Sequence, residues 1–203
     1  MSDEPEQPEC RRLIACGVFV PALENLGLVR RWPGLELKVM PASLHLQPTR
    51  LYQLLVHDLG RGDGPRPRTG LLYGHCFPGI DGFCRKQDIR RASGAHCYEM
   101  LLGPRRFARL MDETAGTFFA ERSLLQNFEQ HCVEPLELED AEVRAATFAH
   151  YRRLIYIRQP GDPDLGPRAA AVADFLGLRL GVLDADYGYF EHLVDDLVRG
   201  GGG

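Results

Sequence analysis

Three cysteines, Cys16, Cys76 and Cys97, each follow a short apolar run of the kind that forms a buried strand. In an open α/β sheet, ligands bind beyond the carboxyl ends of the strands, so side chains that follow different strands meet there. The sequence therefore predicts one cluster of thiols built from three separate elements. The apolar runs that lead to the three cysteines are residues 13–15, 71–73 and 89–92.

A cluster of three thiols is suited to a metal ion. Catalytic zinc takes three ligands from Cys, His or carboxylate side chains and keeps a fourth position open for water or substrate. The three cysteines would supply such a set, and zinc held by thiolates is soft enough to activate an incoming thiol for methyl transfer. The chain has no C-x-x-C pair, and seven residues separate Cys76 from Cys84, which favours an open site over a closed structural one. The histidines that could replace a cysteine are His45, His75 and His96.

Cys97 has a second chemical interpretation as a nucleophile. At the start of a helix, free backbone N–H groups favour the thiolate, and His96 beside it could accept the proton. Glu99 could orient a histidine or act as a base, although a carboxylate in the first turn of a helix is also explained by the helix dipole. The candidate catalytic set is thus Cys97, His96 and Glu99.

Residues 74–82 read Gly-His-Cys-Phe-Pro-Gly-Ile-Asp-Gly and form the most site-like loop of the chain. Its glycines permit tight turns and a close approach of the backbone to a ligand. We therefore predict cofactor contacts from Gly74, His75, Gly79, Asp81 and Gly82. The spacing is not that of a dinucleotide or P-loop motif, and the chain has no G-x-S-x-G serine elbow.

Packing is the alternative for every cysteine, because free cysteine is among the most often buried residue types. We expect it for Cys10, Cys84 and Cys132. Two further groups of residues also have two explanations each. The doubled arginines Arg90, Arg91, Arg105 and Arg106 could bind an anion or be a solvated surface, and Asp184, Asp186 and Tyr187 could contact a ligand or form a turn.

Length and composition restrict the class of protein. The chain has 203 residues, 44% of them hydrophobic, a formal net charge of −4 and six cysteines. The charges are mixed along the chain, which argues against nucleic-acid binding. No run approaches the roughly 18 apolar residues of a membrane helix. We expect a soluble, cytoplasmic protein with a disordered tail over residues 1–11, a single α/β domain over 12–198 and a flexible glycine tail over 199–203.

Strand and helix patterns alternate along the chain. Strands are predicted at 13–20, 35–40, 69–73, 89–92, 116–120 and 179–183. Helices are predicted from Pro21, over 50–59, as two short pieces within 97–112, and over 123–131, 141–157, 168–176 and 189–198. Strands separated by helices predict a three-layer Rossmann-like α/β sandwich with a mostly parallel sheet.

Several short motifs, in this order and spacing, resemble a bacterial and archaeal family catalogued as domain of unknown function 1638. The resemblance covers roughly residues 13–197 and implies a cytoplasmic α/β protein associated with corrinoid-dependent methyltransferases, hence with one-carbon metabolism. The chain departs from the family pattern at His75, at Phe77-Pro78 and at His96, where smaller or acidic residues are usual. The motifs are Ala15-Cys16-Gly17, Pro41-Ala42-Ser43-Leu44-His45, Leu72-Tyr73-Gly74-His75-Cys76, the run from His96 to Gly103, and Gly116-Thr117-Phe118-Phe119.

Two functions follow as expectations. The first is a zinc-dependent protein that transfers a methyl group to a thiol. The second is a non-catalytic accessory protein that binds a metal, an iron–sulfur cluster or a corrinoid and delivers it to a partner enzyme of a methyl-transfer or metallocluster system. A pure scaffold is a third possibility, and in that case the three cysteines should lie far apart.

Overall fold

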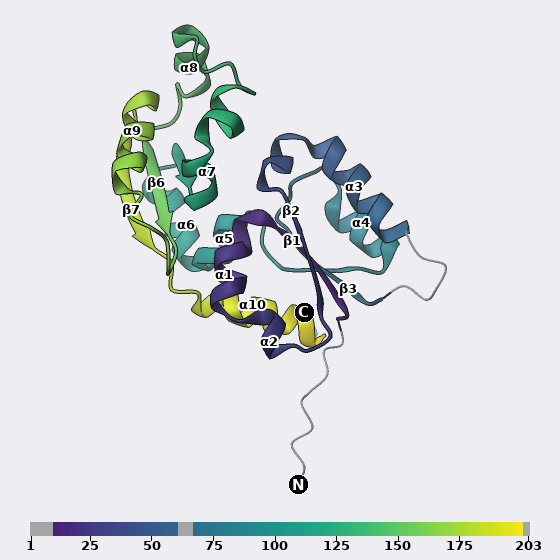
Figure 1. The fold of residues 1–203 in the computed structure, drawn as a ribbon. Helices are drawn as coiled ribbons and strands as arrows, with labels where there is room; N and C mark the ends of the chain where they lie inside the picture. Colours follow the sequence, from purple (N-terminus) through teal and green to yellow (C-terminus); the bar gives the residue numbers. More distant parts are fainter. Residues whose placement is uncertain (1–9, 61–66, 201–203) are drawn as a thin grey trace. The chain divides into compact units, whose positions relative to one another are not determined.

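The computed structural model of the chain describes residues 10–60 and 67–200 (Figure 1). It contains two compact units. The first ends at Leu101 and resumes at Tyr187, and the second spans Leu102–Asp186. Each unit has a parallel β-sheet of its own. The predicted α/β class is confirmed, with the strands divided between two sheets rather than gathered in one. The single domain predicted over 12–198 requires that the two units unfold together. The bounds of that domain therefore stay a prediction.

The sheet of the first unit has the order β2-β1-β3-β4, and all of its strands are parallel. β1 and β3 lie in the middle and are almost wholly buried, which explains their continuous apolar sequences. The chain winds in one direction from β1 to β2 and in the other from β3 to β4, so the switch point lies between β1 and β3. The strands are β1 (Arg12–Cys16), β2 (Glu36–Met40), β3 (Thr69–Leu72) and β4 (Arg90–Arg91).

Helices cover both faces of this sheet (Figure 1). On one face, Tyr52 of α3 packs edge-on against Phe83 of α4. On the other, Phe190 of α10 stacks on Phe19, directly before α1, with ring centroids 5.2 Å apart. The first unit is therefore a three-layer α/β sandwich. Its helices are α1 (Val20–Asn25), α2 (Leu28–Arg31), α3 (Pro48–Gly60), α4 (Ile80–Gln87), α5 (Cys97–Leu102) and α10 (Gly188–Arg199).

The second unit has three parallel strands in the order β5-β6-β7, with β6 in the centre. Its core is formed by one face of the sheet and residues of α7 and α9, and it includes Cys132. α6 contacts the sheet as well, since Phe107 stacks on Phe119. The elements are β5 (Thr117–Ala120), β6 (Arg153–Arg158), β7 (Arg179–Asp184), α6 (Pro104–Glu113), α7 (Arg122–Gln126), a π-helical turn (Glu129–Val133), α8 (Ala141–Thr147) and α9 (Gly166–Leu176).

The predicted helix over 141–157 is wrong in its second half. α8 ends at Thr147, and β6 begins at Arg153 as the central strand of its sheet. Leu154-Ile155-Tyr156-Ile157 are all buried, so this strand is an unbroken apolar run without the alternation that marks a half-exposed strand. A run of this kind cannot be distinguished from a buried helix by periodicity alone.

Two elements near the three cysteines also differ from the prediction. The first strand was expected over 13–20, but it ends at Cys16 and a 3₁₀ turn, Gly17–Phe19, follows. The loop predicted over 74–82 ends earlier, because α4 begins at Ile80 after a left-handed Gly79. Both changes place Cys16 and the loop of Cys76 directly at strand ends.

Cys10, Cys84 and Cys132 are buried, as predicted for packing residues. Residues 1–9 and 201–203, which belong to the predicted tails, lie outside the described residues. Residue 10 of the N-terminal tail is described, and the Cys10 amide donates a hydrogen bond to the carbonyl of Val198 at 3.0 Å. Within the described residues, no helix combines the length and apolar character needed to cross a membrane.

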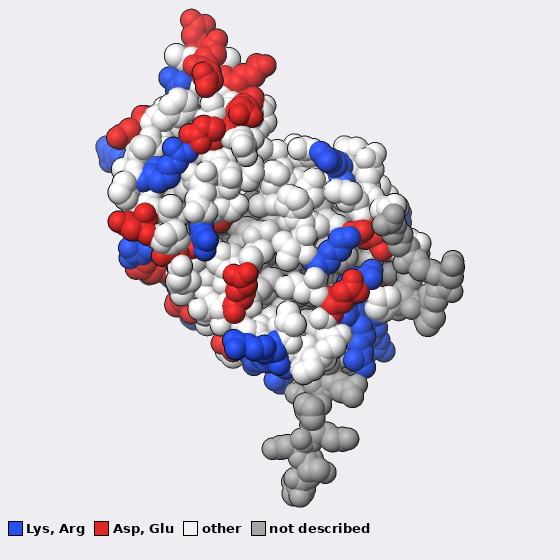
Figure 2. Space-filling model, in the orientation of Figure 1, with Lys and Arg blue, Asp and Glu red and all other residues white. Residues whose placement is uncertain are grey.

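On the face seen in Figure 2, acidic side chains gather around α8, and both signs of charge are mixed elsewhere. The acidic run before and within α8 is exposed. Its members are Glu134, Glu137, Glu139, Asp140 and Glu142.

Candidate functional site

The candidate site lies at the switch point of the first sheet. Cys16 is the last residue of β1, and Tyr73 directly follows β3. The register pairs Ala15 with Leu72, so the next residues along the two strands, Cys16 and Tyr73, are neighbours. The position is the one at which open parallel sheets usually bind ligands.

A close backbone contact brings the loops of Cys76 and Cys97 together. The His75 amide donates to the carbonyl of Ala95 at 2.7 Å. A Cβ atom on Gly74 would lie 2.6 Å from that same carbonyl oxygen, so a larger residue there would force the loops apart. Gly74 thus allows the close approach of the two loops, and the cofactor contact predicted for it stays a prediction.

The three thiols interact in series, with Cys97 in the middle. A hydrogen bond to Cys97, followed by burial, raises the pKa of Cys76 far above its usual range, while the charge of Arg91 acts in the opposite direction. The pKa of Cys97 rises to about 12, first through its hydrogen bond to Cys16. The bond from Cys76 and the backbone N–H of Gly74 lower it by less. In the metal-free protein, Cys76 and Cys97 are therefore protonated at neutral pH.

Tyr73 lies against the same three thiols. Its side chain is 1% exposed, and burial together with the charges that Cys16, Cys76 and Cys97 would carry holds its pKa far above the usual range. The hydroxyl reaches no partner at hydrogen-bond geometry among the described residues. Cys16 also acts on the hydroxyl directly, and that interaction raises the pKa of Tyr73 further.

Arg91 joins the two loops that carry Cys76 and Cys97. Its Nη1 donates to the carbonyl of Tyr73 and to that of Gly94, both at 2.8 Å. Its Nε donates to Asp81 at 2.7 Å, and only 10% of its side chain is exposed. The guanidinium thus links the two loops within the protein. Its Nε and Nη1 are already used as donors and are not free to bind an anion.

Replacing Arg91 with alanine should lower the free energy of unfolding by about 2–4 kcal/mol, because the partly buried carbonyls of Tyr73 and Gly94 lose their donor. Urea unfolding followed by circular dichroism measures the change. Arg90→Ala is the matched control, since the neighbouring side chain is exposed, and it should leave the midpoint within error. Equal midpoints for both variants would contradict the linking role.

His75 and Asp81 lie at the exposed side of Arg91. Arg91 Nη2 lies 3.0 Å from His75 Nε2, and because arginine only donates, Nε2 must be the acceptor nitrogen. In that neutral tautomer the proton is on Nδ1, which can donate a hydrogen bond but cannot coordinate a metal. Arg91, through its hydrogen bond and then its charge, lowers the pKa of Asp81, and His75 adds to this when protonated.

The other predicted site residues have local structural tasks. Glu99 accepts from the amides of Ala95 at 2.7 Å and of His96 at 3.4 Å, which closes the turn before α5. Gly79 provides the left-handed turn before α4, and Gly82 lies inside that helix. His96 is exposed beside Cys97. The catalytic and cofactor roles of these residues stay predictions.

His45 is held within its own 3₁₀ turn, where Nδ1 lies 2.9 Å from the carbonyl of Ala42. In the second unit, Arg158 binds Asp184 through two bonds of 2.6 and 3.0 Å, and Arg106 donates to the carbonyl of Asp184. Arg158, through its hydrogen bond, therefore lowers the pKa of Asp184. These contacts within the protein give the turn at Asp184 a structural explanation that involves no ligand.

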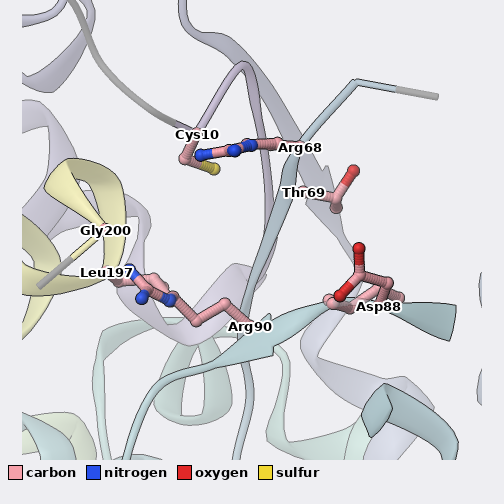
Figure 3. Close-up of a pocket in the computed structure, with 8 residues that line it drawn as sticks. Cys10, Arg68, Thr69, Asp88, Arg90, Leu197 and Gly200 are labelled. Atoms are coloured by element: carbon pink, nitrogen blue, oxygen red, sulfur yellow. The ribbon is translucent and has the colours of Figure 1, made fainter. Parts of the chain in front are cut away.

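A pocket of about 370 Å³ lies elsewhere in the first unit, at the amino ends of β3 and β4 (Figure 3). Its cysteine, Cys10, is occupied by a 2.8 Å hydrogen bond to the carbonyl of Arg12. Because ligands of open parallel sheets bind at the carboxyl ends, we place the candidate site at the three thiols. The pocket is lined by Cys10, Arg68, Thr69, Asp88, Ile89, Arg90, Leu197 and Gly200.

The three thiols fit zinc in their chemistry and in their convergence from separate loops. Within residues 10–60 and 67–200, however, no group of three or more His, Cys, Asp or Glu side chains is arranged to hold an ion directly. Cys97 interacts with each of the other two thiols, which is a chain rather than a ring about one centre. Binding would require the protons to leave and the sulfurs to close around the ion.

Tyr73 is the residue of this site that the sequence did not indicate. It ends an apolar run and looks like one more core position of β3. The signal that could have found it is its register: it neighbours Cys16 and immediately precedes Gly74.

The comparisons with known proteins give a family and no activity. The model of a family described as a protein of unknown function, DUF1638, matches residues 39–194, more than half of the chain. Cys76 and Cys97 lie inside that range, and Cys16 precedes it. No curated protein and no solved structure matches the chain. The parallel α/β fold is the one that the resemblance to this family implied. The chain belongs to the DUF1638 family.

Proposed function

We propose that the protein binds one zinc ion through Cys16, Cys76 and Cys97 and transfers a methyl group to a thiol. The observation that carries the proposal is the position of Cys97, whose thiol interacts with both other cysteines at the switch point of the sheet. Three thiolates and an open fourth position are a ligand set that zinc accepts.

When bound, zinc would supply Lewis-acid activation of an incoming thiol. Cys16, Cys76 and Cys97 would hold the ion, and the incoming thiol would give up its proton to solvent as its sulfur formed a bond to the methyl carbon. The bond between the methyl group and its donor breaks, and the electron pair stays with the donor. An electrophilic donor such as a methylcorrinoid suits this step and agrees with the association implied by the family.

The charges of the site support a zinc–thiolate centre. Three thiolates around a divalent ion leave one net negative charge. Arg91 is the cation whose charge already acts on Cys76, and it is fixed by four contacts. Its charge favours the deprotonated thiols that a metal requires. The exposed His75 lies at the same loop, where a substrate would enter.

Zinc binding by the wild-type protein tests the proposal. We expect about one zinc per chain, and cobalt in its place should give the intense near-ultraviolet absorption of thiolate–cobalt bonds. Loaded protein should then methylate a small thiol with methylcorrinoid as the donor, measured by mass spectrometry. Absence of stoichiometric zinc would overturn the site.

The accessory function is the alternative hypothesis for the same site. Zinc that stays bound while no methyl transfer occurs would overturn the enzymatic part alone. Metal, cluster or corrinoid that passes from this protein to an acceptor would establish the delivery role instead.

A further inference from the structure

A second pocket, of about 510 Å³, lies within the second unit at the amino ends of β6 and β7. Its volume is in the range of pockets that take small organic ligands. Among the described residues that line it, three are arginines and none is acidic. The pocket of the first unit, by contrast, includes Asp88 beside its arginines.

Two of the three arginines are direct neighbours in the sheet. The register of β6 and β7 pairs Arg153 with Arg179, so both side chains leave the sheet on the same face. Arg152, the residue before β6, brings a third positive charge to the pocket. Like charges opposite each other on neighbouring strands are destabilising. An anion bound between these side chains would remove that repulsion.

Arg153 is fixed by contacts within the protein. Its Nε donates to the hydroxyl of Thr117 at 2.9 Å, and its Nη2 donates to the carbonyl of Leu110 at 2.6 Å. Its Nη1 lies 3.5 Å from a carboxylate oxygen of Glu113. Arg153 therefore contributes charge to the pocket, and Glu113 offsets one of the three positive charges.

The other two arginines keep donors for a ligand. Arg179 is exposed, and within the described residues its side chain makes no hydrogen bond or ion pair. Arg152 uses only Nη1, which donates to the carbonyls of Ala149 and Tyr151 at 2.8 and 2.9 Å. Its Nε and Nη2 stay available. A guanidinium with two such N–H groups matches the spacing of phosphate or carboxylate oxygens.

The rest of the pocket is apolar. Ile155 is buried in its floor, and Leu180 is 38% exposed at its side. A Cβ atom on Gly181 would lie 2.7 Å from Cδ1 of Ile155, so the glycine keeps this part of the sheet surface open. The pocket thus offers positive charge next to apolar surface.

We propose that this pocket binds a small phosphate monoester, with the phosphate held by Arg152 and Arg179 and the organic group against Ile155 and Leu180. The three arginines and Glu113 leave a net charge of +2. A phosphate monoester carries about −2 at neutral pH and presents three acceptor oxygens. This site lies apart from the three cysteines and does not depend on zinc.

Calorimetric titration of the full chain with phenyl phosphate at low salt tests the proposal. We expect Arg179→Ala to weaken binding by about 10- to 100-fold, because a charged hydrogen-bond donor is lost. Its urea midpoint should equal that of the wild type, since Arg179 has no partner among the described residues. Arg109→Ala is the matched control: this exposed arginine of α6 does not line the pocket, and its loss should leave affinity unchanged.

Two further ligands test the chemical class. Benzoate keeps the ring but carries one charge, and inorganic phosphate lacks the ring, so both should bind more weakly than phenyl phosphate. No binding of phenyl phosphate, or equal losses in Arg179→Ala and Arg109→Ala, would overturn the site. Benzoate that binds as tightly as phenyl phosphate would overturn the assignment to a dianion, and inorganic phosphate that does so would overturn the role of the apolar surface.

Discussion

Replacing Cys97 with serine should abolish stoichiometric zinc binding. Cys97 interacts with both other cysteines, so its loss breaks the cluster into two separate thiols. Serine keeps the size of the side chain but offers a hydroxyl, which zinc does not take as a structural ligand at neutral pH. Metal analysis of protein purified without oxygen measures the stoichiometry.

Cys84→Ser is the matched control for this variant. Cys84 is in the same unit, buried in α4, and burial raises the pKa of its thiol to about 11. Its replacement should leave zinc stoichiometry near one. Cys16→Ser and Cys76→Ser should each lower the stoichiometry as Cys97→Ser does. Full retention of zinc in any two of these three variants would refute the three-cysteine site.

Zinc affinity should rise steeply with pH, by at least about 100-fold per pH unit near neutrality. The pKa values of Cys76 and Cys97 are raised, so both thiols hold their protons in the metal-free protein well above neutral pH. Zinc must displace those two protons, and each displaced proton makes affinity about 10-fold stronger per pH unit. The sign is therefore positive: raising the pH removes the competing protons and strengthens binding.

Chelator competition between pH 6 and 8 measures this slope, and a calorimetric titration in buffers of different ionisation enthalpy counts the protons released. Arg90→Ala serves as a reference, because that exposed side chain is absent from the interactions that act on Cys76. An affinity that does not change with pH would mean that the thiols are not the ligands.

The sequence predicted that the three cysteines would lie near one another, as they do, because the rule it used is geometric. Strand ends in a parallel sheet lie at one edge, and Cys16, Cys76 and Cys97 each follow an apolar run. The short helices around Gly103-Pro104 and the strand at 35–40 were also predicted, since breaker residues and alternation mark them locally.

The parts that were missed depend on contacts distant in the sequence. Residues 154–157 form a strand because neighbours on both sides pair with them, and nothing local separates that run from a helix. Arg91 looks like half of an exposed pair in the sequence, but its partners are 3 to 18 positions away. Tyr73 has apolar neighbours on its N-terminal side, and only the register with β1 places it beside Cys16.

The unit that carries the three cysteines is discontinuous in the chain, since it ends at Leu101 and is completed from Tyr187 onward. During synthesis, α10 emerges after the second unit, yet it supplies the ring of Phe190 for Phe19 and a backbone partner for Cys10. The inserted second unit is continuous in the chain and has been fully synthesised before α10. A ribosome-bound chain that stops at Asp186 would therefore contain every cysteine but would lack α10, which packs against the unit that carries them.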